Sequence, residues 1–155
     1  MRPDAPVGHT PILRDWWTRD HLSAIRAISP EGKRSFHGQD DAMNSEDVVA
    51  FLAHLRREVP GRMVLIWDGS PMHRSHTIQA FLANGASQRL HLERLPAYAP
   101  ELNPDEGFWP QLKGVEMRNL CCFNRRHLRD ELRAAVKRVR RKPRILTGCF
   151  AGTGL

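Results

Sequence analysis

The feature that most constrains the fold is an uninterrupted apolar run, residues 63–67 (MVLIW), which ends at Asp68. The run has the length of a strand, and apolarity at every position favours burial on both of its faces. A predicted helix precedes it, with apolar residues at helical spacing from Val48 to Val59 and a cap at Asn44 or Ser45. Helix followed by buried strand is typical of an α/β fold with parallel strands.

The remaining patterns predict further elements of the same class. Residues 21–29 and 33–39 flank the turn-forming Pro30-Glu31-Gly32 and predict a hairpin. A helix should begin at Pro104 behind a cap at Asn103, and Pro110 should kink it because proline cannot donate a backbone hydrogen bond. Also expected are a helix over residues 75–84, a strand over 89–95 and a helix over 126–141.

Positive charge is concentrated near the C-terminus. The chain has a formal net charge of +7, and residues 118–144 hold 11 Lys or Arg against two acids, whereas the rest is slightly acidic. Such a segment favours a polyanionic partner, nucleic acid above all, although a solvated basic helix without a partner has the same composition. No apolar stretch is long enough to cross a bilayer, so we expect a cytoplasmic protein with no membrane partner.

Asp68 and Glu106 are the candidate catalytic and metal-binding residues. Asp68 stands where the apolar strand ends, and ligands of parallel α/β sheets gather at the carboxyl ends of strands. Glu106 lies 38 positions later, in the first turn of the helix that Asn103 caps. Two such carboxylates in a basic chain suggest a magnesium site that acts on phosphate. Each has a structural alternative, because Asp68-Gly69 is turn-like and Asn103 to Glu106 has the spacing of a capping box.

Three further side chains have two interpretations each. His73 is placed to orient a carboxylate or to contact a phosphate, and an exposed loop histidine is the alternative. Tyr98 and Trp109 have rings that can stack on bases, whereas packing in the core is the alternative favoured for Trp109.

Residues 67–75 read WDGSPMHRS and residues 98–109 read YAPELNPDEGFW, with Leu112-Lys113 following. Together these segments resemble the DDE transposases of bacterial insertion sequences related to the mariner group. The Asn-Pro-x-Glu element with its preceding Tyr-x-Pro is specific to that group, and the segment around Asp68 is moderately so. The resemblance extends from about Gly8 to the C-terminus.

The resemblance implies an RNase H-like α/β fold, a mixed sheet flanked by helices. It implies three acids that hold two divalent ions, Mg²⁺ or Mn²⁺, for attack of water or a DNA 3′-hydroxyl on a phosphodiester of transposon or target DNA. By position Asp68 would be the second acid and Glu106 the third. Family members commonly work as dimers on DNA, so a homodimer is also expected.

The first acid of the family has no counterpart in the sequence. It would lie on a strand upstream of residues 5–11, and only seven residues precede Gly8. That strand is central in the family's sheet, between the second and fourth strands, so its absence leaves unpaired edges that favour association. We therefore expect one truncated domain over residues 1–155, with a basic helical segment at about 118–144. It should hold an ion weakly, be inactive alone and need an upstream transposase polypeptide.

Two alternatives to a metal-dependent transposase domain stay open. A non-catalytic DNA-binding remnant would act through the basic tail, and a different RNase H-like nuclease would cut RNA–DNA hybrids. The residues expected to contact DNA are His73, Arg74, Lys113, Arg125, Arg126, Arg129, Arg133, Lys137, Arg138, Arg140, Arg141 and Lys142.

Overall fold

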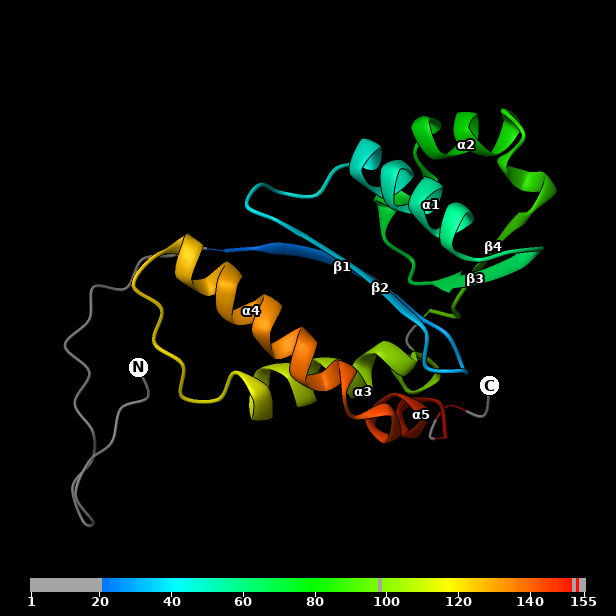
Figure 1. Cartoon of the computed structure of the whole chain (residues 1–155). Helices are drawn as coiled ribbons and strands as arrows, with labels where there is room; N and C mark the ends of the chain where they lie inside the picture. The colour runs from blue at the N-terminus through cyan, green and yellow to red at the C-terminus, as the bar shows by residue number, and fades with distance from the viewer. Residues whose placement is uncertain (1–20, 98, 152, 154–155) are drawn as a thin grey trace, which may run out of the picture.

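The computed structural model describes residues 21–97, 99–151 and 153, and these form a mixed α/β arrangement (Figure 1). Strands β1 (Ser23–Ile28) and β2 (Arg34–Gln39) make an antiparallel hairpin. In its turn the amide of Ser29 donates to the carbonyl of Lys33 over 2.8 Å, and Gly32 takes a φ of 77° that suits glycine. The predicted hairpin is confirmed.

Helix α1 (Ser45–Glu58) follows the hairpin and begins at a complete capping box. The Asn44 side chain accepts from the amide of Asp47, and the Asp47 carboxylate accepts from the amide of Asn44, each over 2.9 Å. Of the two caps that the sequence allowed, Asn44 is therefore the one used.

A parallel β–α–β unit follows. Strand β3 (Met63–Trp67) pairs in parallel with β4 (Leu90–Arg94), and α2 (His76–Ala83) connects them. The hydroxyl of Ser75 caps α2, and the chain leaves the helix through Gly85, which has a φ of 90°. These elements agree with the predicted ones to within one or two residues.

The expectation that β3 is buried on both faces is wrong. Val64 is 65% exposed and Ile66 42% exposed, whereas the alternate residues Met63, Leu65 and Trp67 pack against the core formed with α1. The reason is that β3 has only β4 as a neighbour: β1–β2 and β3–β4 are two separate two-stranded sheets. Among the described residues, no strand lies between β1 and β3.

The second half of the molecule is helical. Helix α3 (Pro104–Gln111) contains Pro110 and passes directly into a π-helical segment, η4 (Leu112–Glu116). Proline has no amide hydrogen for the α-helical pattern, so the disturbance predicted at Pro110 is followed by a widened turn. Helix α4 (Arg125–Arg140) is capped by Asn124, whose side chain accepts from the amide of His127 over 2.9 Å.

Helix α5 (Pro143–Ala151) was not predicted, because the strongly basic residues before it led us to treat the C-terminal region as a single basic segment. Two signals were present. Pro143 occupies a favoured first helical position, and Ile145 and Cys149, four residues apart, both pack against the helical core.

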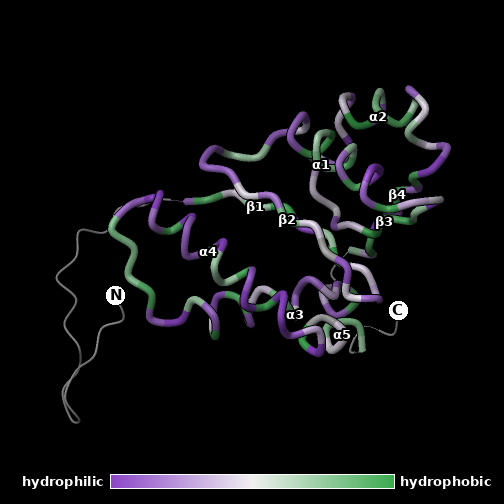
Figure 2. Tube along the Cα trace, in the orientation of Figure 1, coloured by the Kyte–Doolittle hydropathy of each residue, from purple (hydrophilic) through white to green (hydrophobic). Residues whose placement is uncertain are grey.

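Two hydrophobic cores lie on opposite sides of the β1–β2 hairpin, and Figure 2 shows apolar residues recurring along the elements around both. Ile25 and Ala27 of β1 pack against one core, and Ile28 with Phe36 packs against the other. The sheet-side core consists of Val48, Phe51, Leu52, Leu55, Ile78 and Leu90, and the helix-side core of Phe108, Leu112, Leu132, Ala135, Val136 and Val139. Among the described helices, none combines the length and apolarity that crossing a membrane requires.

Candidate metal and DNA site

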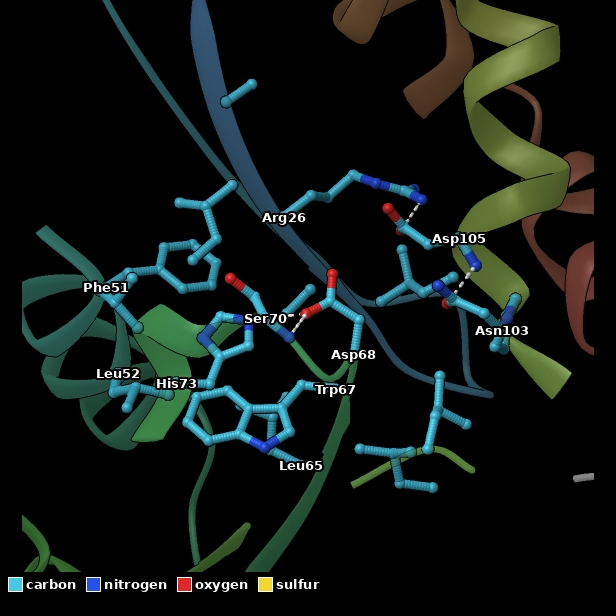
Figure 3. Close-up of a pocket in the computed structure, with 18 of the residues that line it drawn as sticks. Arg26, Phe51, Leu52, Leu65, Trp67, Asp68, Ser70, His73, Asn103 and Asp105 are labelled. Atoms are coloured by element: carbon cyan, nitrogen blue, oxygen red, sulfur yellow. Dashed lines mark hydrogen bonds and ion pairs between the residues drawn. The ribbon is translucent and has the colours of Figure 1, made fainter. Parts of the chain in front are cut away.

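Asp68 directly follows β3, and its carboxylate is held on one oxygen. Oδ1 accepts a hydrogen bond from the backbone amide of Ser70 over 2.9 Å and lies 3.1 Å from Nε2 of His73 (Figure 3). The side chain is nevertheless 66% exposed. Within the described chain, Oδ2 has no hydrogen-bond partner, so it is the oxygen available to a ligand.

His73 is fixed by its surroundings more firmly than a loop histidine usually is. The short 3₁₀ turn η1 (Pro71–Arg74) brings its ring onto Trp67, with the ring centroids 4.1 Å apart and the planes within 9°. Burial lowers the pKa of His73, while the charge and hydrogen bond of Asp68 act in the opposite direction. The 3.1 Å separation of Nε2 and Oδ1 makes the imidazole the side-chain partner of this carboxylate oxygen.

The start of α3 carries two acids with different environments. The Asn103 side chain accepts from the amide of Asp105 over 3.0 Å, and the Asp105 carboxylate forms an ion pair with Arg26 of β1. The Arg26 side chain is only 2% exposed, and its guanidinium lies 3.4 Å from the centroid of the Phe108 ring. Glu106 is exposed beside this pair. The arrangement ties α3 to the hairpin and leaves Glu106 as the acid with no protein partner among the described residues.

One cavity, of about 510 Å³, joins these elements. It lies between the hairpin and β3, and its lining is mainly apolar, with Val64 and Ile66 from β3 and Ile25 and Ile28 from β1. Its polar lining includes Asp68, Ser70, His73, Asn103 and Asp105, but not Glu106 (Figure 3). The end of β3 and the first turn of α3 therefore border the same space, and Glu106 stands one residue beyond it.

The described residues do not complete a two-ion metal centre. No group of three or more His, Cys, Asp or Glu side chains among them is placed to hold a metal. A two-metal site needs several carboxylates that bridge and flank the ions. One carboxylate with an available oxygen, together with water ligands, is at most a partial Mg²⁺ site.

Three of the predicted DNA contacts form ion pairs with acids of the described chain. Arg129 pairs with Asp40, and both Arg138 and Lys142 bind the buried carboxylate of Glu116. Hydrogen bonds from Lys142 and then Arg138 hold the pKa of Glu116 below its ordinary value, against the effect of its desolvation. His73 lies against Asp68. The others are exposed: Arg74, Lys113, Arg125, Arg126, Arg133, Lys137, Arg140 and Arg141.

Of the two aromatic candidates for base stacking, Trp109 packs against the helix-side core and meets Phe108 edge to face, with ring centroids 5.9 Å apart. Tyr98 falls outside the described residues. Arg26 and Asp105 are the site residues that the sequence reasoning missed. A signal did exist, because Arg26 is a lone charge inside the apolar strand pattern of β1.

The comparisons with known proteins decide the family. The profile of the DDE superfamily endonucleases matches residues 3–129, most of the chain. The chain belongs to the DDE superfamily endonucleases. No curated protein matches it significantly. The α/β class predicted from the sequence is confirmed, with one antiparallel and one parallel two-stranded sheet flanked by helices.

Two solved structures are similar to this family member. The Mos1 transposase catalytic domain, solved with raltegravir and magnesium, aligns with a TM-score of 0.49 at 16% identity, over 86% of this chain and 83% of that one. The Mos1 mariner paired end complex with manganese aligns with the same score and identity, over 99% of this chain and 51% of that one. The chain thus spans about half the length of that transposase.

Proposed function

We propose that this chain is the C-terminal part of a transposase catalytic domain, from the mariner-related insertion-sequence group, that acts on transposon DNA. Asp68 is the second acid of its site and Glu106 the third. The chain is inactive alone and is completed by polypeptide that lies upstream of it. The observation that carries this proposal is that the end of β3 and the first turn of α3 border one cavity.

The two acids differ in how the chain prepares them. Asp68 has one oxygen fixed by donors and one available, which is the state expected of a carboxylate that ligates a cation. Glu106 is exposed, and its neighbour Asp105 takes the ion pair with Arg26. A divalent cation at this place would activate water, or the DNA 3′-hydroxyl that hydrolysis releases, for in-line attack on phosphorus.

The separation of the sheets supports the need for upstream polypeptide. A strand placed between β1 and β3 would pair with both and cover the exposed side chains of Val64 and Ile66. An acid at the end of such a strand would enter the cavity that Asp68 already lines. The same added segment would thus supply both the missing strand and the missing carboxylate.

A plasmid-nicking assay in Mg²⁺ or Mn²⁺ tests this proposal. The chain alone should leave supercoiled DNA intact. Co-expression with an upstream polypeptide that carries an apolar strand ending in aspartate should give metal-dependent nicks. In that complemented protein, Asp68→Asn and Glu106→Gln should each return nicking to background.

Glu101→Gln is the matched control, because it removes an exposed carboxylate of the same segment that is not a proposed ligand. At a temperature where this variant is folded, it should keep most of the nicking activity. Equal nicking by the complemented wild type and by both the Asp68 and Glu106 variants would overturn the proposal. Loss of activity in the Glu101 variant as well would show that nicking does not depend on the proposed third acid specifically.

A second candidate, a non-catalytic DNA-binding remnant, is favoured by the exposed cations of α4. Arg126, Arg133 and Lys137 are exposed on this helix, and Arg141 follows directly at its end. In this case binding should be independent of metal and weaken steeply with salt, with a log–log slope of about −0.9 for each phosphate contacted.

Fluorescence anisotropy with a duplex oligonucleotide measures that slope. Replacing these four residues by Gln should make the slope shallower, whereas replacing the exposed Arg57 and Arg62, outside the basic segment, should change it less. A salt-insensitive affinity would exclude this second function.

A further inference from the structure

Trp67 packs against the ring of His73, and His73 in turn contacts one oxygen of Asp68. The imidazole stacks on Trp67, the last residue of β3, and its side chain is only 14% exposed. Its Nε2 lies 3.1 Å from Asp68 Oδ1, and the amide of Ser70 reaches the same oxygen over 2.9 Å. Two donors from one short turn thus meet one carboxylate oxygen (Figure 3).

The second ring nitrogen of His73 supports the same orientation. Nδ1 is buried and has no hydrogen-bond partner among the described residues. A ring held only by packing could turn over about its Cβ–Cγ bond at little cost, because neither orientation would gain a polar contact. Here only Nε2 has a partner, so the stack fixes the ring and the ring directs its N–H at Asp68.

We propose that His73 is a positioning residue, which holds the Asp68 carboxylate in one rotamer with Oδ2 directed outward as a cation ligand. The inference rests on the proposed function for the role of Oδ2, but not for the rotamer itself. It also replaces the expectation that His73 contacts DNA. An exposed aspartate otherwise samples several rotamers, and fixing one of them when a ligand binds costs conformational entropy.

Two substitutions separate this role from simple packing. His73→Phe keeps an aromatic ring for the stack on Trp67 but has no donor for Asp68. His73→Gln keeps a donor amide but loses the stack. A positioning role predicts that the Phe variant is the damaging one for Asp68, and a purely structural role predicts that the Gln variant is.

The first measurement needs no metal and no activity. Three-bond carbon–proton couplings in the Asp68 side chain, measured by NMR on the full chain, should show one dominant rotamer in the wild type and in His73→Gln. His73→Phe should show averaging. A single rotamer in His73→Phe, or averaging in the wild type, would overturn the proposal.

The second measurement is Mn²⁺ affinity, followed by the loss of the free-ion EPR signal. His73→Phe should weaken binding by about tenfold, as expected for loss of a group that orients a ligand, and His73→Gln should weaken it much less. Asp68→Asn is the reference for this arm. If Asp68→Asn leaves Mn²⁺ binding unchanged, the proposed metal role of Asp68 fails, while the rotamer result still decides the role of His73.

Discussion

The helix side of this molecule, around the helix-side core, and the sheet side, around the sheet-side core, differ in how completely their apolar strands and helices are covered. On the helix side, six buried apolar residues interlock, and the carboxylate of Glu116 binds cations from α4 and from the segment just after it. On the sheet side, two large apolar residues of β3, Val64 and Ile66, remain exposed beside a cavity. The hairpin is the wall that both sides share (Figure 1).

The difference shows where the described residues leave apolar surface and a strand edge without a partner. The helix side has a packed apolar core and pairs its buried charge with its own residues, and its two large exposed apolar residues, Val115 and Phe123, lie outside any strand. The sheet side has an apolar strand whose second edge and second face lack a partner within the described residues. The proposed function places a further strand at this edge, and we expect the helix side to be the more cooperative part of the fold.

The largest effect should come from the helix-side core. Leu112 is fully buried, so Leu112→Ala should lower the free energy of unfolding by about 3 kcal/mol, from lost burial and from the cavity left behind. Val64→Ala, at the exposed position of β3, should cost less than about 0.5 kcal/mol. Urea denaturation of both variants checks the contrast, and equal losses would remove the distinction between the two sides.

The next effect concerns the joint between the sides. Arg26→Met removes the buried guanidinium that pairs with Asp105 and covers the Phe108 ring. Asp105 then stays as a half-buried charge without its cation, so we expect a loss of about 2 kcal/mol. A double-mutant cycle with Asp105→Asn should show coupling, and additive losses would mean that the pair does not tie α3 to the hairpin.

A smaller effect, with a definite pH dependence, is expected at Glu116. Its folded pKa is lowered, so its stabilisation is fully present above the ordinary carboxyl pKa of about 4.3 and is lost as pH falls through the lower folded value. Glu116→Gln should cost about 1–2 kcal/mol at pH 7, because Lys142 and Arg138 are half exposed and can be rehydrated.

Chemical denaturation of wild type and variant across the acid range measures this difference. The gap between the two proteins should narrow as the pH falls below the ordinary carboxyl range. If the difference in free energy of unfolding stays constant with pH, Glu116 stabilises the fold through packing and not through its charge.

The smallest effect on stability should come from Ile66→Lys on β3. The side chain is 42% exposed, so its replacement should change the free energy of unfolding by less than about 0.5 kcal/mol. A charge beside an unpaired strand edge should nevertheless reduce self-association. Sedimentation velocity of both proteins tests this, and unchanged association would place any dimer contact elsewhere.

Much of the fold could be read from local patterns. The hairpin turn around Gly32 and the cap at Asn103 are each set by a few neighbouring residues and are found where the sequence placed them, and Asn44 is one of the two caps that the sequence allowed for α1. The sequence wrongly predicted that both faces of β3 are buried. An apolar pattern shows that a strand favours burial, but the exposure of its side chains also depends on whether a neighbouring strand is present.

The site was only partly predictable for the same kind of reason. Asp68 follows from its place at the end of an apolar strand. The contact between Arg26 and Asp105 joins residues 79 positions apart, which no local pattern records. The pairing of Arg138 and Lys142 with Glu116 was likewise hidden, because a basic helix looks the same whether its cations face DNA or a buried acid.

The most direct test of the account asks whether Asp68 and Glu106 share one cation. Fe²⁺ can replace Mg²⁺ at such a site, and with peroxide it cuts the backbone close to where it is bound. We expect metal-site cuts in both residues 67–70 and residues 103–106, lost from both places in Asp68→Asn and suppressed by excess Mg²⁺. Cuts confined to one of these segments, or unchanged by the substitution, would contradict the account.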